Sequence, residues 1–195
     1  QVKEDRENFN VLIFGRGDSE DFKLKGFDIA ARAVAELNDE KYHLYAVGAP
    51  HGQQEDVEKK LLQCDISRRQ LTVRGFIECR DEVAQLLCEV DLAIMPSRTE
   101  GFGLTALEAL AAGLPILVGK NSGFAKALQK INESACIVNS EDRKEWANAI
   151  RLIKEKPRSE RLQEAKRLKE RCESEFAWSG RCQALTEKIL LLVGK

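Results

Sequence analysis

Short apolar runs alternate along most of the chain with stretches whose apolar residues recur at helical spacing. The runs predict strands at Asn10–Phe14, His43–Val47, Leu71–Val73, Asp91–Met95, Pro115–Val118 and Ala135–Val138. Between them, sets such as Ala30, Ala33, Val34 and Leu37 fall on one face of a helix. Alternating strands and helices predict parallel strands joined by right-handed crossovers. The expected fold is therefore α/β, a single Rossmann-like doubly wound parallel sheet of about six strands.

After Asn139 the pattern becomes entirely helical, which predicts extra helices at the C-terminus. Trp146, Ile150 and Ile153 mark one helix that Pro157 ends, and a charged helix follows from about Glu160 to Glu173. A last helix carries Leu185, Ile189 and Leu192 on one stripe. Without internal repeats, residues 10–195 are expected to form one domain. The polar residues 1–9 are expected to be a linker within a longer protein.

Composition excludes several classes of function. Of 195 residues, 43% are apolar and 32% charged, as in ordinary globular domains. The 31 basic and 32 acidic residues nearly cancel, so we expect no nucleic-acid partner. No apolar run approaches the length of a membrane span, and the polar start is unlike a signal peptide.

The cysteines and histidines predict no metal site. The six cysteines form no C-x-x-C pair, and the chain has only two histidines. Unpaired cysteines of this kind are typical of reduced thiols, so a cytoplasmic location is expected.

The most informative loop follows the fourth predicted strand. It contains Gly101 and Gly103 and leads into a helix that we expect to begin near Gly103. Glycines allow close backbone approach, and the free N–H groups of a helix start favour a phosphate. Glu100 and Glu108 would flank such an anion and accept hydrogen bonds from sugar hydroxyls. Alternatively, Glu108 is a solvated helix residue and Glu100 an acid of the N-terminal turn that the helix dipole favours.

The loop after the first strand carries two cations and several glycines. Gly15, Arg16 and Gly17 end the strand, and Lys25 and Gly26 open the next helix. Arg16 and Lys25 could hold a diphosphate without a metal ion, or they could be ordinary surface residues. A dinucleotide fingerprint is excluded because Glu20 replaces its third glycine. The spacing from Gly113 to Gly119 likewise excludes a P-loop.

Taken in order, these segments resemble glycosyltransferase family 4, the retaining enzymes of the two-domain GT-B architecture. The stretch EGFGLTALEALAAGLPILV from Glu100 to Val118 resembles the E-x7-E signature of that family and its following strand. The other matching segments are Gly15-Arg16, Lys25-Gly26, Val47-Gly48-Ala49-Pro50, Val73-Arg74-Gly75-Phe76 and the aromatic pair Phe176 and Trp178. The resemblance covers nearly the whole chain.

This resemblance implies a nucleoside-diphosphate sugar as donor substrate, with a UDP-sugar favoured, and no cofactor. Arg16 and Lys25 would stabilise the diphosphate leaving group, and Glu100 would hold the donor sugar, which makes these three the candidate catalytic residues. Glu108 would hold the ribose. The remaining implied contacts come from Gly15, Gly48, Arg74, the base-bordering loop Gly75, Phe76 and Ile77, and the backbone of Phe102, Gly103, Leu104 and Thr105.

Two departures from the family pattern bear on function. The acid expected after the fifth strand is Lys126, and the N-terminal acceptor domain of the family has no counterpart in the chain. No Asp-x-Asp sequence occurs, so cations and a helix end would replace a metal ion. We expect the donor domain of a glycosyltransferase. The alternatives are a non-catalytic nucleotide-sugar-binding module of a larger protein and a structural domain used for protein contacts.

Overall fold

A computed structural model describes residues 7–18 and 20–176 of the chain. Within them, six strands form one parallel sheet in the order β3-β2-β1-β4-β5-β6. They are β1 (Phe9–Phe14), β2 (Tyr42–Ala49), β3 (Leu71–Gly75), β4 (Leu92–Met95), β5 (Ile116–Gly119) and β6 (Ile137–Val138). All six predicted strands are confirmed, although β2 and β3 are longer than predicted and β6 is shorter. The doubly wound α/β fold is confirmed with them.

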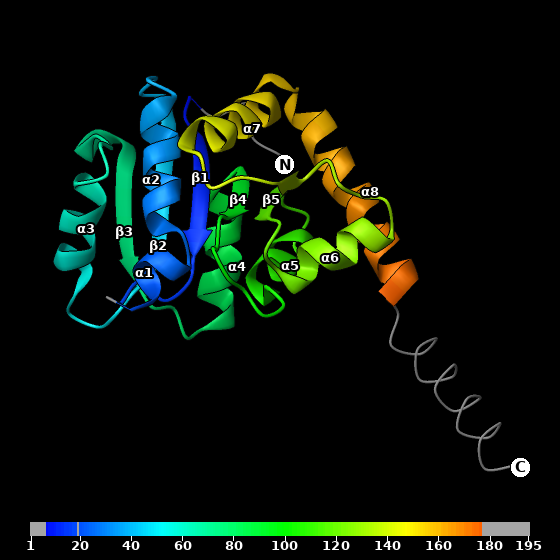
Figure 1. Ribbon diagram of the computed structural model, residues 1–195, viewed down its shortest axis with the longest axis horizontal. Helices are drawn as coiled ribbons and strands as arrows, with labels where there is room; N and C mark the ends of the chain where they lie inside the picture. The colour runs from blue at the N-terminus through cyan, green and yellow to red at the C-terminus, as the bar shows by residue number, and fades with distance from the viewer. Residues whose placement is uncertain (1–6, 19, 177–195) are drawn as a thin grey trace, which may run out of the picture.

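Helices connect consecutive strands and close the described part of the chain (Figure 1). They are α1 (Asp21–Leu24), α2 (Phe27–Glu36), α3 (Gln54–Leu62), α4 (Arg80–Glu89), α5 (Leu104–Ala111), α6 (Gly123–Lys130), α7 (Arg143–Glu155) and α8 (Arg158–Phe176), with a 3-10 turn η1 (Arg68–Gln70) before β3. The short helix α1 was not predicted. Asp18 starts it by accepting the N–H of Asp21 at 2.8 Å, and Phe22 anchors it by stacking on Phe27.

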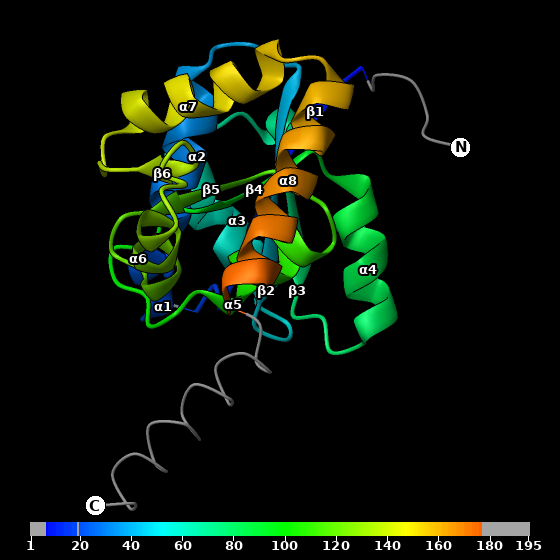
Figure 2. The same ribbon diagram turned by 90° about the vertical axis from the view of Figure 1, so that its right-hand side faces the viewer.

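Each face of the sheet has its own apolar core. Helices α2, α3 and α7 cover one face, where Phe27, Leu61 and Trp146 share one core with side chains of all six strands. On the other face lie α4, α5, α6 and α8, with Leu86 and Phe124 among the buried side chains. Figure 2 shows α2 and α7 on one side of the strands and α4 on the other. Burial on both faces explains why the strands are continuous apolar runs.

The two last described helices agree with the pattern of the sequence. Helix α7 ends just before Pro157, and α8 follows at once. Helix α8 is held against α5, and Lys169 donates to the carbonyl oxygen of Ala111 at 2.7 Å. The predicted aromatic partner Trp178 and the predicted helix after it lie outside the described residues.

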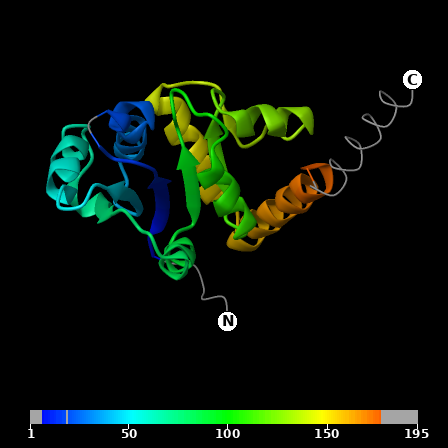
Figure 3. The same ribbon diagram turned by 90° about the horizontal axis from the view of Figure 1, so that it is seen from below.

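All strands point the same way, so the loops after them gather at one edge of the sheet. In Figure 1 the arrowheads of β1 and β3 point to the lower edge, and Figure 3 views the molecule from that side. Ligands of open parallel sheets bind at this carboxyl edge, where the strand order reverses between β1 and β4. The loops β1–α1 and β4–α5 lie there side by side.

Candidate functional site

The β4–α5 loop presents the free N-terminus of a helix. Gly103 adopts a left-handed conformation with φ of 95° directly before α5. L side chains rarely adopt this φ, so the turn favours glycine. Within the described residues, the N–H groups of Leu104 and Thr105 have no recorded acceptor. They are suited to an anion, as the sequence predicted.

The neighbouring helix α6 has no comparable opening, because the β4–α5 loop occupies its N-terminus. The N–H groups of Gly123 and Phe124 donate to the carbonyl oxygens of Gly101 and Phe102 at 2.8 and 2.7 Å. The hydroxyl of Ser122 accepts the N–H of Ala125 at 3.0 Å. Helix α6 therefore supports the loop, and α5 is left to face a ligand.

Two of the three candidate catalytic residues meet directly. Nζ of Lys25 lies 2.8 Å from Oε2 of Glu100, and the two side chains are only 27% and 17% exposed. The other oxygen, Oε1, accepts the N–H of Gly101 at 3.1 Å. The backbones also approach closely, because a Cβ atom at Gly26 would lie 2.2 Å from the carbonyl oxygen of Pro96. A cation and a carboxylate are thus held together beside the start of α5.

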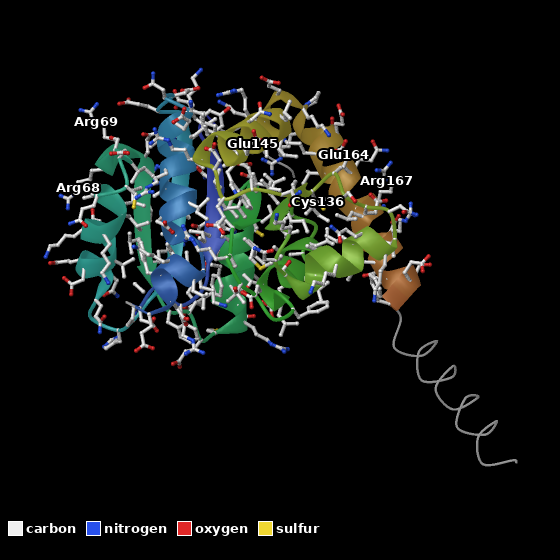
Figure 4. All side chains as sticks on the ribbon, viewed as in Figure 1. Arg68, Arg69, Cys136, Glu145, Glu164 and Arg167 are labelled. Atoms are coloured by element: carbon white, nitrogen blue, oxygen red, sulfur yellow. The ribbon has the colours of Figure 1, made fainter. Side chains whose placement is uncertain are left out.

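The third candidate, Arg16, lies in the β1–α1 loop with its side chain 76% exposed. Its Nε is 3.8 Å from Oδ2 of Asp21, a contact that is worth little at such exposure. The side chain is therefore free to reorient toward a ligand. Three other arginines labelled in Figure 4, Arg68, Arg69 and Arg167, lie away from the lower edge of the sheet and therefore away from these loops.

Gly15 and Gly48 pack against each other and support the β1–α1 loop. Gly48 has φ of 114°, and a Cβ atom there would lie 1.9 Å from the carbonyl oxygen of Gly15. The N–H groups of Gly15 and Gly17 donate to the carbonyl oxygens of Val47 and Gly48 at 3.1 and 3.0 Å. The contact between Gly15 and Gly48, together with these hydrogen bonds, fixes the path of the β1–α1 loop that carries Arg16.

Two residues predicted to contact the donor lie at the end of β3. Phe76 lies near the carboxyl edge of the sheet, and Arg74 points away from it. Phe76 is 60% exposed, while its N–H donates to the carbonyl oxygen of Ala49 at 3.0 Å. The guanidinium of Arg74 instead pairs with Glu89, at the end of α4, at 2.6 Å and lies over the ring of Tyr45. Its charge is therefore engaged on the α4 face of the sheet.

Glu108 lies on the second turn of α5, where it is exposed and borders an apolar cleft between α4 and α5. Thr105 borders the same cleft, whose walls include Phe14, Val83 and Leu87. Ile77, from the loop that was predicted to border the base, packs against the core on this face. A carboxylate at this position can accept hydrogen bonds from vicinal hydroxyls such as those of a ribose.

Arg98 was missed by the sequence analysis, although it joins the two loops of the site. Its guanidinium donates to both oxygens of Asp28, at 2.8 and 3.0 Å, and to Glu141 at 3.0 Å. These hydrogen bonds, chiefly those with Asp28, raise the pKa of Arg98 above its ordinary value. Asp28 stands within the apolar face of α2, and an acid at such a position signals a buried cation partner.

Two features are absent from the described residues. They contain no group of three or more His, Cys, Asp or Glu side chains placed to hold a metal ion. Among residues 7–18 and 20–176, no helix has the length and apolar character needed to cross a bilayer.

The fold and the site define a class of protein: a Rossmann-like α/β domain whose glycine loops and one open helix N-terminus meet at the carboxyl edge of the sheet. The family model "Family 4 Glycosyltransferase in conflict systems" matches residues 1–185, and the chain belongs to this family.

Curated relatives agree with this assignment, and a solved structure agrees with the fold. The chain is 32% identical over 148 residues to D-inositol 3-phosphate glycosyltransferase of Stackebrandtia nassauensis, a match that covers 71% of the chain and 33% of the relative. It is 38% identical over 93 residues to a GDP-mannose-dependent phosphatidylinositol dimannoside mannosyltransferase of Mycobacterium tuberculosis, covering 48% and 24%. The structure of Anabaena HepE in complex with UDP and glucose superposes with a TM-score of 0.71 at 24% identity, covering 94% and 48%.

The chain therefore spans about a third or less of the length of these two curated relatives, and about half of HepE. HepE, at its low sequence identity, supports the fold alone.

Proposed function

We propose that the chain is the donor-binding domain of a retaining, metal-independent glycosyltransferase that uses a nucleoside-diphosphate sugar. The observation that carries the proposal is the Lys25–Glu100 pair beside the free N–H groups of α5. Lys25 and the start of α5 would hold the diphosphate, Glu100 the sugar and Glu108 the ribose. Membership in family 4 supports the assignment.

The proposed chemistry is stabilisation of the leaving group. As the bond from sugar to diphosphate breaks, negative charge grows on the β-phosphate. Lys25, a reoriented Arg16 and the positive end of α5 would offset that charge, which is the task that a metal ion performs elsewhere. Positioned charges of this kind act most strongly where water is excluded. A second domain would supply the acceptor and close the site.

A UDP-sugar is the preferred donor in this proposal, and a GDP-sugar is the main competitor. The family resemblance favours UDP, while the name of the mycobacterial relative specifies GDP-mannose. Cys64, Cys79, Cys136 and Cys172 are not in disulfides, which agrees with the reducing, cytoplasmic location that we propose.

Calorimetry with UDP, GDP and ADP, with and without EDTA, tests donor binding. We expect one nucleoside diphosphate to bind with micromolar affinity and EDTA to have no effect. If none of the three binds more tightly than millimolar, the proposal is wrong. If EDTA abolishes binding, the metal-independent part is wrong.

A second candidate is a non-catalytic sensor of nucleotide sugars, which Lys126 favours because it stands where the family pattern has an acid. The same pocket would bind the donor without transfer. A donor-hydrolysis assay on the full-length protein separates the two, comparing wild type with Glu100→Ala. Slow hydrolysis that Glu100→Ala abolishes supports the enzyme. Tight binding with no turnover in either protein, with or without acceptors, supports the sensor.

A further inference from the structure

The side chain of Arg98 contacts two segments that are far apart in the sequence, α1–α2 and the residues before α7. Its guanidinium donates to Asp28 in α2, to Glu141 before α7 and to the backbone carbonyl of Lys23 in α1. The N–H of Arg98 itself donates to the carbonyl oxygen of Leu24 at 2.9 Å. One residue thus fastens the β4–α5 loop to the segments on both sides of it.

The contact with Asp28 depends on the shape of the arginine side chain. Asp28 is 5% exposed, and a carboxylate at this depth needs a cation or several donors to remain charged. Nη1 and Nη2 of Arg98 each donate to one of its oxygens, a bidentate arrangement that the single ammonium group of lysine cannot reproduce. The bond is therefore both strong and directional.

Each end of this bond lies within three residues of the Lys25–Glu100 pair. Asp28 follows Lys25 by three positions, and Arg98 precedes Glu100 by two. Between them, Gly26 packs on the carbonyl oxygen of Pro96 with no room for a side chain. The two loops can hold Lys25 and Glu100 at a fixed separation only while they stay pressed together.

We propose that Arg98 is a positioning residue, which holds the ammonium of Lys25 and the carboxylate of Glu100 in place for the diphosphate and the sugar of the donor. The inference rests on the proposed function, because it names what organises that same site. Arg98 acts through its neighbours. Its guanidinium is already engaged by Asp28, Glu141 and a backbone carbonyl, so it is not a direct ligand of the phosphates.

A double-mutant cycle with calorimetry tests the inference. The probe is UDP, or GDP if the wild-type chain prefers it. Arg98→Gln is expected to weaken binding about tenfold in the wild-type background, because Lys25 loses its support. In a Lys25→Met background the same change is expected to cost at most about twofold, since the residue that Arg98 positions is already absent.

Arg143→Gln is the matched control. Arg143 also bridges two acids, Glu36 at 3.0 Å and Asp65 at 3.4 Å, but from α7. It should leave nucleotide affinity unchanged in both backgrounds. Arg98→Lys should recover part of the affinity lost in Arg98→Gln, and it takes the place of Arg98→Gln in the cycle if that variant does not fold.

The outcomes separate this inference from the function on which it rests. If the wild-type chain binds none of the nucleotides, the proposed function fails and the inference fails with it. If the wild type binds but the change at Arg98 has no effect, or weakens binding equally in both backgrounds, only the positioning role is refuted. If Arg98→Gln lowers the melting temperature but leaves nucleotide affinity unchanged, the positioning role is also refuted.

Discussion

The ammonium group of Lys25 lies 2.8 Å from a carboxylate oxygen of Glu100, although the two residues are 75 positions apart in the sequence. The pair is mostly shielded from water, so the two charges attract each other more strongly than a surface pair would. A diphosphate that binds to Lys25 must therefore share the cation with Glu100. The carboxylate would weaken the binding of a bare nucleotide and contribute to binding only when a sugar is present.

The first prediction concerns this competition. Glu100→Gln keeps the shape of the side chain but removes its charge. We expect UDP to bind roughly threefold to tenfold more tightly, because Lys25 is no longer neutralised and the repulsion of the phosphates is removed. UDP-glucose should gain less or lose affinity, because the amide is a weaker acceptor for sugar hydroxyls. Calorimetry with both ligands measures the two changes.

The control for this prediction is Glu133→Gln. Glu133 is also an ion-paired acid, with a side chain 15% exposed, but its partner is Arg171 on α8. Glu133→Gln should change the affinity for neither UDP nor UDP-glucose. Weaker UDP binding in Glu100→Gln, or an equal gain for both ligands, would contradict the role assigned to Glu100.

The second prediction separates the ribose from the sugar. Glu108→Ala should weaken UDP and UDP-glucose alike, by about 1–3 kcal/mol, because both ligands contain the ribose that Glu108 would bind. The exposed Glu145 on α7, labelled in Figure 4, provides the matched Glu→Ala control. A loss confined to UDP-glucose would show that Glu108 contacts the donor sugar instead.

Most of the fold was predictable because each buried strand has to be apolar on both faces. The runs around Val11, Leu44 and Leu117 carry that signal in the sequence, and the structure buries all three completely or nearly so. The short helix α1 gave no such signal. It has only four residues, and one buried side chain, Phe22, is too little for a helical period to show.

The site was predictable in part. Glycine spacing and the E-x7-E pattern located the loop before α5, since both are local properties of the chain. The pairing of Arg98 with Asp28 joins residues 70 positions apart, and no local pattern reports such a contact. Arg74 shows the opposite case. It ends a strand as a loop cation would, but the alternation of side chains along β3 directs it to Glu89 on the α4 face.

The third prediction concerns the backbone beneath the site. Gly48→Ala should destabilise the protein by at least about 3 kcal/mol, because its Cβ atom would collide with the carbonyl oxygen of Gly15. Gly52→Ala is the matched control. Gly52 also has a positive φ, 74°, but a Cβ atom there meets nothing within 4 Å, so it should cost only about 1 kcal/mol. Urea unfolding of both variants gives the comparison. Equal losses in the free energy of unfolding would show that the contact between Gly48 and Gly15 does not exclude a side chain.

The fourth prediction is a pH dependence of stability that arises from His43 on β2. Partial burial lowers the pKa of His43, and its Nε2 lies 2.8 Å from Oγ1 of Thr72. In the unfolded chain a histidine has a pKa of about 6.5, so below that pH the unfolded state takes up a proton that the folded state resists. The free energy of unfolding should therefore fall as the pH drops from 7.5 to 5.5, and His43→Gln should reduce this fall. Urea denaturation across that range measures it, with the exposed His51→Gln as control. Parallel pH curves for wild type and His43→Gln, or an equal reduction in His51→Gln, would contradict the assignment.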